Sequence, residues 1–461
     1  MLVGAVEQQL LQPTLQQANE QLDLAVNAGL ADASRVELTW ARGRREPEGD
    51  TIDRLRNAVT AAALNGTSLY VALYPFGSSQ TPLSDGDQSD FVAWATAVAK
   101  AVPEEHHFII GNEPNLNRFW LPQFGPNGED VAAPAYVSLL AKTYDALKGV
   151  SDSIEVLGGA LSHAGIDRPG SGRDTHSPTA FIQDMGAAYR ASGRDRPIMD
   201  AFTFHPYMLS SDEPPALQHP DSTTITIADY GKLVDLLAKA FDGTAQKGST
   251  LPIVYDEFGV ESVIPDDKES LYNGSEPKTI KPVSEETQAT YYRQALQLAF
   301  CQPNVRGFLV FSLIDENQHA GWQSGLYYAN GTPKPSLTGV QDAANQVRRN
   351  VISACAGVEV TPRLRVTWFP DGRPGTGSST LPFMLTCDVD CFYTARLERL
   401  PTHGTTRVAR GRAVGRSGTK VEFPSVRLAP GRYRLTLVAA ATQNVGPSAR
   451  AVSPAFTIPR T

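Results

Sequence analysis

Short apolar runs alternate with amphipathic segments along the first 350 residues. Eight runs have the length and two-sided apolar character of buried parallel strands, at residues 2–6, 35–40, 68–74, 108–110, 154–162, 201–207, 253–257 and 307–315. After each run, apolar residues recur at helical spacing, and several of these segments stop at Gly or Asn-Gly. The predicted helices are 14–29, 51–64, 89–101, 134–148, 179–191, 230–241, 284–300 and 334–350.

This alternation predicts an α/β fold, a (β/α)8 TIM barrel. Strands that alternate with helices form parallel βαβ units, and eight of them within 350 residues fit a barrel with insertions. A doubly wound open sheet is the alternative, but it usually has a Gly-rich phosphate turn after its first strand. Here that turn reads Glu7-Gln8-Gln9, so neither a dinucleotide site nor a P-loop is supported.

The pattern changes after about residue 355, where short strand-like segments are separated by turns rich in Gly, Pro and Ser. These segments are 361–368, 381–386, 392–397, 405–414, 419–426, 431–439 and 451–458. Seven short strands in about 100 residues predict a small all-β sandwich of the immunoglobulin or fibronectin type. We therefore expect a barrel domain at 1–352 and a sandwich domain at 353–461.

Composition places the chain among ordinary globular proteins, with 41% hydrophobic and 20% charged residues. A net charge of −8 and a pI of about 5.6 argue against nucleic acid or an anionic membrane as a partner. No apolar run approaches the roughly 18 residues that a membrane span needs. We expect a monomer that binds neither nucleic acid nor a membrane.

Four cysteines bear on the cellular compartment. We favour the disulfides Cys301–Cys355 and Cys387–Cys391, although the second pair resembles half a metal site and all four could be free thiols. Disulfides imply export. No leader is visible before the first strand, so we expect a secreted or cell-surface protein whose leader is absent from this numbering, with the cytoplasm as the alternative.

Two glutamates stand where predicted strands end. Glu113 lies in Gly111-Asn112-Glu113-Pro114 after the fourth strand, and Glu257 ends the seventh. In a barrel the carboxyl ends of all strands converge on one face, so these carboxylates should face each other. Glycosidic bonds are cleaved by such a pair, in which one group protonates the leaving oxygen and the other attacks the anomeric carbon when the two are about 5–5.5 Å apart.

The Asn-Glu-Pro motif and the second strand-end Glu resemble those of clan A glycoside hydrolases, a retaining superfamily that includes families 5 and 39. The resemblance covers roughly residues 1–350 and implies that Glu113 is the acid/base and Glu257 the nucleophile. Asn112 would then bind the sugar 2-hydroxyl. Asp256 remains an alternative nucleophile, although strand alternation points it away from Glu257.

Further substrate-binding candidates follow from the same resemblance. The segment from Arg35 to Trp40 resembles the second-strand signature of family 5, in which an Arg holds the nucleophile ionised. His205-Pro-Tyr207 resembles the end of the sixth strand in the same enzymes, where a His or Tyr contacts the nucleophile. In these enzymes strand eight often ends in an aromatic platform, usually Trp. Here the segment runs from Phe311 to His319 without a Trp, and Trp322 comes later on a loop. The remaining candidate is His163, which is equally consistent with a structural role.

These features predict a retaining glycoside hydrolase that acts on a carbohydrate and needs no metal or organic cofactor. Long insertions at 116–133, 163–178, 208–224 and 261–283 would wall the mouth and favour exo action on a terminal sugar or a β-glycoside. The alternative is a carbohydrate-binding barrel without catalysis. The sandwich could itself bind sugar, but its few aromatic residues favour a packing or spacer role.

Overall fold

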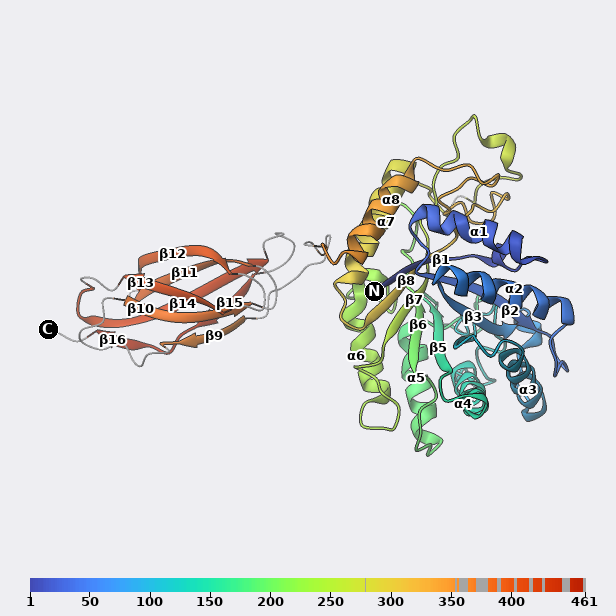
Figure 1. Ribbon diagram of the computed structural model, residues 1–461. Helices are drawn as coiled ribbons and strands as arrows, with labels where there is room; N and C mark the ends of the chain where they lie inside the picture. Colours follow the sequence, from blue (N-terminus) through green and yellow to red (C-terminus); the bar gives the residue numbers. More distant parts are fainter. Residues whose placement is uncertain are drawn as a thin grey trace. The chain divides into compact units, whose positions relative to one another are not determined.

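A computed structural model describes residues 1–277, 279–352, 355, 364–369, 380–387, 391–401, 404–413, 418–424, 428–441 and 448–458. The chain divides into two compact units, Met1–Ala356 and Gly357–Thr461 (Figure 1). Each unit has its own core and is described by itself.

The first unit is the predicted barrel. Its eight strands are all parallel and pair in sequence order, and β1 also pairs with β8 to close the ring. The predicted sixth strand is too long because Pro206 lacks the N–H that a ladder needs. The predicted eighth strand is also too long, since residues 311–315 belong to the loop that follows. The strands are β1 (Leu2–Val6), β2 (Ala33–Trp40), β3 (Ser68–Pro75), β4 (His107–Ile110), β5 (Glu155–Ser162), β6 (Ala201–His205), β7 (Ile253–Phe258) and β8 (Val305–Val310).

One α-helix of the described residues follows each strand, as predicted. Side-chain caps at Thr14, Ser84, Ser177 and Ser284 begin four of them by accepting backbone N–H groups. Gly29 ends the first helix in the left-handed conformation. The helices are α1 (Leu15–Ala28), α2 (Gly49–Asn65), α3 (Asp85–Ala101), α4 (Ala132–Val150), α5 (Pro178–Ala191), α6 (Tyr230–Phe241), α7 (Glu285–Phe300) and α8 (Ser336–Arg348), with short 3-10 turns η1 (Gln8–Leu10), η2 (Ser78–Gln80), η3 (Ile227–Asp229) and η4 (Glu269–Leu271).

Side chains from every strand fill the barrel interior. They form one buried cluster of Val6, Ala33, Tyr70, Ala72, Tyr74, Ile109, Leu157, Ala160, Ala201, Val254 and Leu309. Burying these apolar side chains stabilises the closed ring. The interior enclosed by these side chains is therefore a packed core.

The second unit packs two antiparallel sheets face to face, as predicted for a sandwich. One has the order β13-β10-β9, and the other β12-β11-β14-β15, with β16 also pairing with β14. Alternate residues such as Phe383, Leu397 and Leu435 meet in a common core. The strands are β9 (Leu364–Trp368), β10 (Thr380–Cys387), β11 (Cys391–Leu400), β12 (Gly404–Ala413), β13 (Gly418–Pro424), β14 (Gly431–Ala441), β15 (Ala449–Val452) and β16 (Phe456–Ile458).

The last predicted strand, 451–458, is two strands. Ser453 and Pro454 interrupt it, and Ser453 bonds to Leu435 through its backbone N–H and its hydroxyl. Both pieces still pair with β14. The outer ends of three other predicted strands (361–363, 414 and 425–426) lie outside the described residues.

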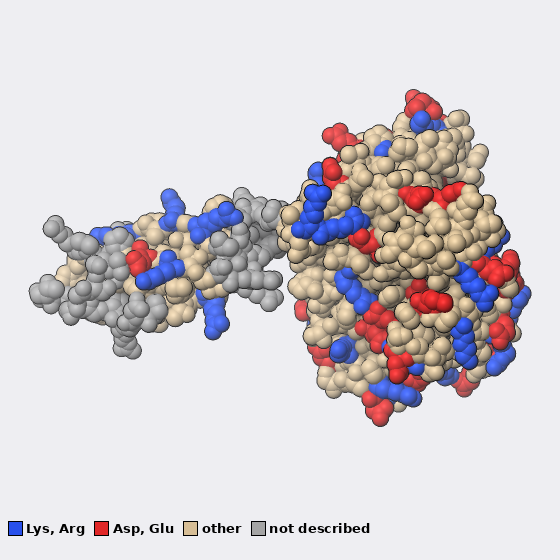
Figure 2. Space-filling model, in the orientation of Figure 1, with Lys and Arg blue, Asp and Glu red and all other residues tan. Residues whose placement is uncertain are grey.

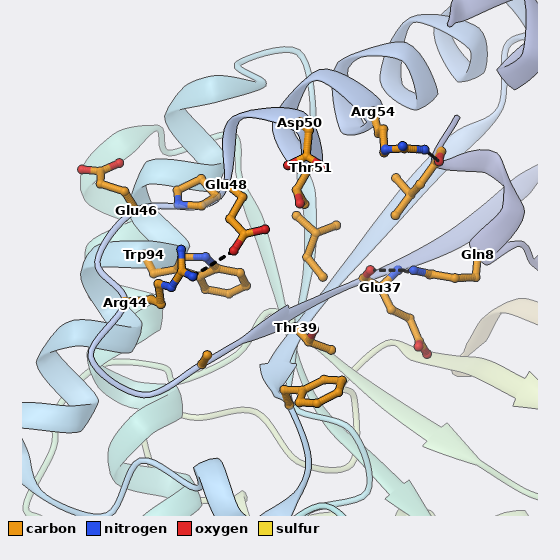
Figure 3. Close-up of a pocket in the computed structure, with 15 residues that line it drawn as sticks. Gln8, Glu37, Thr39, Arg44, Glu46, Glu48, Asp50, Thr51, Arg54 and Trp94 are labelled. Atoms are coloured by element: carbon orange, nitrogen blue, oxygen red, sulfur yellow. Dashed lines mark hydrogen bonds and ion pairs between the residues drawn. The ribbon is translucent and has the colours of Figure 1, made fainter. Parts of the chain in front are cut away.

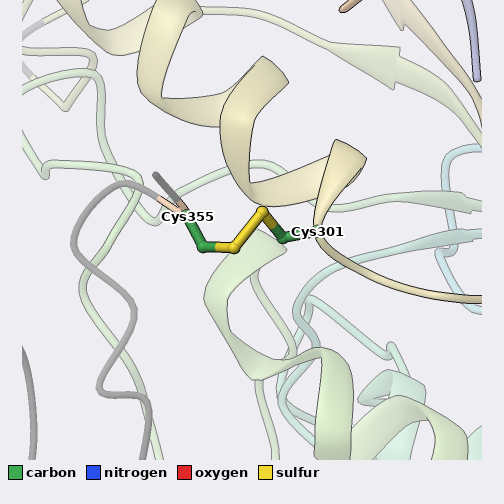
Figure 4. Close-up of a disulfide and its surroundings, with 2 residues drawn as sticks. All are labelled: Cys301 and Cys355. Atoms are coloured by element: carbon green, nitrogen blue, oxygen red, sulfur yellow. A yellow bond between two sulfur atoms is a disulfide. The ribbon is translucent and has the colours of Figure 1, made fainter. Parts of the chain in front are cut away.

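Both expected disulfides are present. Cys301–Cys355 joins the end of α7 to the chain after α8 (Figure 4), and Cys387–Cys391 joins the end of β10 to the start of β11. This pairing excludes the metal half-site and the free-thiol interpretations.

In the described residues, no helix combines the length and apolarity that a membrane crossing requires.

Candidate active site

The tip of β4 holds Glu113 in an unusual backbone conformation. Gly111 has a φ of 99°, and a Cβ there would lie 2.9 Å from the Tyr136 ring, so glycine is required. Glu113 itself has a φ of 41°, and its N–H donates to the carbonyl of Ala160 at 2.7 Å. Ala160 also has a positive φ, of 47°. Left-handed non-glycine residues cost energy and cluster at functional sites, so this turn is held by its surroundings.

Arg35 on β2 connects three strand ends. The side chain is fully buried. Its Nη1 donates to Glu257 Oε1 at 2.5 Å and lies 3.1 Å from Glu37 Oε1, while its Nη2 donates to Asn112 Oδ1 at 2.8 Å. Burial would lower the pKa of Arg35, but the nearby carboxylates, Glu257 first, raise it above its usual value. The guanidinium is therefore a permanent cation beside Glu257.

His205 at the end of β6 contacts both glutamates. Its Nδ1 is 3.1 Å from Glu113 Oε1 and 3.4 Å from Glu257 Oε2. Burial lowers the pKa of His205, but Glu257 and Asp256 outweigh burial and raise it to about 10. The imidazole is thus protonated at neutral pH. The two candidate catalytic carboxylates share one cation, and both reach solvent, with 15% and 10% of their side chains exposed.

Burial distinguishes Asp256 from Glu257. Asp256 Oδ2 lies 3.4 Å from Arg35 Nε and its Oδ1 lies 3.4 Å from His205 Nε2, so it contacts the same two cations as Glu257. Glu257 reaches other atoms of these cations, Arg35 Nη1 and His205 Nδ1, and the β7–β8 register shifts between Tyr255 and Phe258. Asp256 is fully buried, which leaves only Glu257 accessible to a substrate.

The ionisation of these two acids follows from the same contacts. Burial raises the pKa of Glu257, while His205 and then Arg35 oppose that rise. Burial would also raise the pKa of Asp256, but His205 and Arg35 lower it below its usual value. Asp256 is consequently a fixed anion beneath the site, which keeps His205 charged.

Aromatic side chains line the mouth next to Glu257. Tyr207 donates its hydroxyl to Glu257 Oε2 at 3.0 Å, and its ring centroid lies 5.1 Å from that of Trp322. Phe311 packs edge-on against both rings. A cavity of about 140 Å³ is lined in part by Tyr207, Trp322, His163 and Glu261. Burial lowers the pKa of His163 to about 4, so this half-buried ring is neutral.

Trp40 takes no part in this lining. It is fully buried, packs edge-on against Phe91 of α3, and donates its indole N–H to the carbonyl of Arg44 at 2.7 Å. Alternation along β2 explains the difference, because Arg35 and Glu37 point toward the barrel axis while Trp40 points toward the helices. The same alternation identifies Glu37, which the motif comparison missed.

The Glu37 side chain contacts Arg35, and Glu37 also lines two further cavities. Its Oε2 accepts the Tyr74 hydroxyl at 2.6 Å, and Gln8 bonds to its backbone on both sides. One cavity of about 300 Å³ lies between the ends of β1 and β8. The other, of about 490 Å³, lies beside the β2–α2 loop, with the Arg44–Glu48 ion pair on its wall (Figure 3).

In the described part of the chain, no three His, Cys, Asp or Glu side chains gather in a way suited to a metal ion.

Comparisons with known proteins bear on the fold of this chain. No protein-family model and no curated protein matches the sequence. A glucosidase from Croceicoccus marinus is similar over 92% of this chain and 93% of its own, at 9% identity and a TM-score of 0.51. That match and the closed barrel confirm, at the level of the fold, the expected resemblance to glycoside hydrolases.

Two further solved structures match with lower scores. A family 39 β-xylosidase from Caulobacter crescentus covers 96% of this chain and 95% of its own, at 16% identity and a TM-score of 0.47. A calcium-binding mutant of Bacteroides uniformis β-glucuronidase 2 matches 99% of this chain at 12% identity and a TM-score of 0.47. This chain spans only 45% of the length of that β-glucuronidase.

Proposed function

We propose that this protein is a retaining glycoside hydrolase that uses Glu257 as nucleophile and Glu113 as acid/base. The observation that carries the proposal is the approach of two solvent-reaching carboxylates to the same nitrogen of His205, with Arg35 bound to one of them. Glycosidic bond cleavage needs two carboxylates with separate roles. Here the Arg35 guanidinium and the Tyr207 hydroxyl both donate to Glu257, whereas Glu113 shares only the His205 cation, which favours different roles for the two carboxylates.

In the first step, Glu257 attacks the anomeric carbon while Glu113 protonates the departing oxygen. Arg35 and Tyr207 each hold one oxygen of Glu257, so the carboxylate is oriented before the substrate arrives. In the second step, Glu113 takes a proton from water, which attacks the same carbon and releases Glu257. Asn112, which accepts a hydrogen bond from Arg35 Nη2, would bind the sugar 2-hydroxyl as positive charge develops on the ring.

The His205 contacts support retention of configuration. Glu113 Oε1 and Glu257 Oε2 can be no further apart than the sum of their distances to His205 Nδ1, 3.1 and 3.4 Å. That upper limit falls at the lower end of the roughly 6.5–9.5 Å found in inverting enzymes. A separation below it leaves too little room for an inverting water and favours a covalent intermediate.

We also propose exo action on a terminal sugar or a β-glycoside. The loops after β4 to β8 are hydrogen-bonded each to the next, which would support a wall around the mouth of the barrel. His176 N donates to Asn115 O, Ile225 N to His163 O, Ser211 N to Ile280 O, and Asn273 N to Asn317 O. A wall of this kind suits a substrate that enters by its end.

Secretion is part of the same proposal. Disulfides form and persist in oxidising compartments, and this chain has two with no free cysteine among its described residues. We propose a monomer that meets its carbohydrate substrate outside the cell or at its surface.

The test is hydrolysis of a panel of aryl β-glycosides and glycans by the wild type, Glu113→Ala and Glu257→Ala. Glu104→Ala, at an exposed position on the same unit, is the matched control. Both site variants should lose roughly 100-fold or more of kcat/KM. Azide should rescue Glu257→Ala with an inverted product and Glu113→Ala with a retained one, because it fills the space that each carboxylate leaves.

Two results would contradict the assignment. Site variants as active as Glu104→Ala would remove the proposed roles from Glu113 and Glu257. If the wild type bound sugars in calorimetry but cleaved nothing in the panel, the alternative of a non-catalytic carbohydrate-binding barrel would replace the enzyme.

A further inference from the structure

Charge is divided unequally between the two units. Residues 357–461 contain 15 Lys and Arg against 6 Asp and Glu, whereas residues 1–356 contain 26 against 43. The sandwich unit therefore has a net charge of +9 and the barrel unit −17, and the total of −8 for the whole chain conceals the difference. Basic side chains dominate the coloured surface of the sandwich in Figure 2, while acidic ones are frequent on the barrel. Of the 15 basic residues in the sandwich, 14 are Arg.

The register of β11 with its neighbours shows which arginines share a face. Ala395 and Leu397 are buried in the core, so Thr394, Arg396 and Glu398 point to the outer face. Directly paired residues lie on the same side of a sheet. Thr394 pairs with Arg410 of β12 and with Val438 of β14, and Val438 pairs in turn with Arg450 of β15.

The outer face of the larger sheet is consequently basic. Phe392 pairs with Arg412, Glu398 with Arg434, and Leu400 with Arg432. Neighbouring strands are about 4.8 Å apart and alternate residues along a strand about 6.8 Å, so the guanidinium groups form a grid spanning four strands. Among the described residues that this register places on the face, one is acidic, Glu398. The arginines of the face are Arg396, Arg410, Arg412, Arg432, Arg434 and Arg450.

Apolar groups stand among these arginines. Phe392 is 56% exposed, and Val408 and Val452 are also well exposed on the same face. An exposed aromatic ring offers a flat surface for the C–H face of a sugar ring. The face thus combines repeated anion-binding groups with an apolar platform.

We propose that this face binds an acidic polysaccharide, one that carries carboxylates or sulfates along its chain. The planar fork of Arg matches such anions in a bidentate manner, and an open sheet suits a linear polymer with repeated charges. A four-strand face cannot enter a DNA groove, which admits a helix or a two-stranded ribbon. Single-stranded nucleic acid would need several aromatic side chains on which its bases could stack, whereas the register places one aromatic residue, Phe392, on this face. This inference goes beyond the proposed catalysis and is tested by binding alone.

The experiment measures binding of the full chain to polygalacturonate and to chondroitin sulfate by biolayer interferometry. Dextran is the neutral polymer control, and duplex DNA and phosphatidylserine vesicles are the competing anions. The test variant is Arg396→Gln/Arg410→Gln/Arg450→Gln. The matched control is Arg168→Gln/Arg173→Gln/Arg349→Gln, which changes the net charge equally at exposed barrel positions.

The wild type should bind at least one acidic polysaccharide more tightly than dextran, DNA or vesicles, and binding should weaken with salt. The test variant should bind roughly 100-fold more weakly, at about fivefold for each guanidinium removed, while the control variant binds as the wild type does. Hydrolysis of an aryl glycoside, if present, should be unchanged in both variants.

Four outcomes would overturn the proposal. They are no binding to either acidic polymer, equal losses of affinity in the two triple variants, tighter binding to DNA or vesicles than to either polymer, and salt-sensitive self-association in sedimentation that the test variant abolishes. Such self-association would mean that the basic face of one copy binds the acidic barrel of a second copy.

Discussion

Replacing Lys334 should destabilise the barrel far more than replacing a surface lysine with the same ion-pair distance. Lys334 Nζ lies 2.7 Å from Asp315 Oδ2, and both side chains are fully buried. It also donates to Ser262 Oγ at 2.9 Å and to the carbonyl of Gln323 at 3.0 Å. These bonds join the loops after β7 and β8 to the start of α8.

The magnitude follows from what Lys334→Met leaves behind. The methionine fills most of the space of the lysine stem but leaves Asp315 with two donors, Tyr272 Oη at 2.7 Å and Gly325 N at 2.8 Å. A buried carboxylate without its cation costs about 3–5 kcal/mol of the free energy of unfolding. The control is Lys142→Met, because Lys142 and Asp85 are also 2.7 Å apart but 40% and 97% exposed. An exposed pair contributes about 1 kcal/mol or less.

Urea unfolding followed by tryptophan fluorescence measures both variants. Four of the five tryptophans, at positions 40, 94, 120 and 322, belong to the barrel, so the signal reports mainly on that unit. The midpoint and slope give the free energy of unfolding. If Lys334→Met costs no more than Lys142→Met, burial does not control the strength of this pair and the reasoning fails.

Three further predictions follow from other contacts. Tyr207→Phe should lower kcat/KM for an aryl glycoside by roughly 10- to 100-fold with unchanged circular dichroism, because the hydroxyl donates to Glu257; unchanged kinetics would contradict it. Burial raises the pKa of Glu7 from 4.5 to about 8, so its contribution to stability is complete below pH 4.5 and is lost as pH rises through 8; Glu7→Gln should remove that decline in urea midpoints measured across this pH window. Cys301→Ser should lower the free energy of unfolding by roughly 4 kcal/mol, since the bond to Cys355 closes a separation of 54 residues, and a cost below about 1 kcal/mol would contradict the chain-entropy account.

The sequence predicts the fold well because hydrophobic periodicity reports directly on burial. The eight strands, their helices and most strands of the sandwich follow from it, and so does the position of Glu113 and Glu257 at strand ends. The contacts around them do not follow, because Arg35 reaches Glu257 across 222 residues of sequence. Nor does any local signal predict the positive φ of Glu113, which depends on Ala160 of a neighbouring strand.

Two further features are encoded in the sequence but are easily hidden in it. Alternation along β2 places Glu37 beside Arg35 and turns Trp40 toward α3, whereas the motif comparison treated the whole strand as one unit. The positive charge of the sandwich is apparent only when charged residues are counted separately for the two units, because the larger negative charge of the barrel hides it in the total for the chain. Local periodicity must therefore be combined with domain boundaries before composition is interpreted.

The disulfide between Cys301 and Cys355 determines how a mechanical load would enter the barrel. Tension on the chain beyond Cys355 passes across the sulfur bridge to the end of α7, so the segment that contains α8 lies in a covalent loop and carries no load. Without the bridge, the same pull would peel α8 away from α7 first and open the β8–β1 closure of the ring. A protein held to a solid polymer by its second unit would thereby keep its barrel closed under flow or drag.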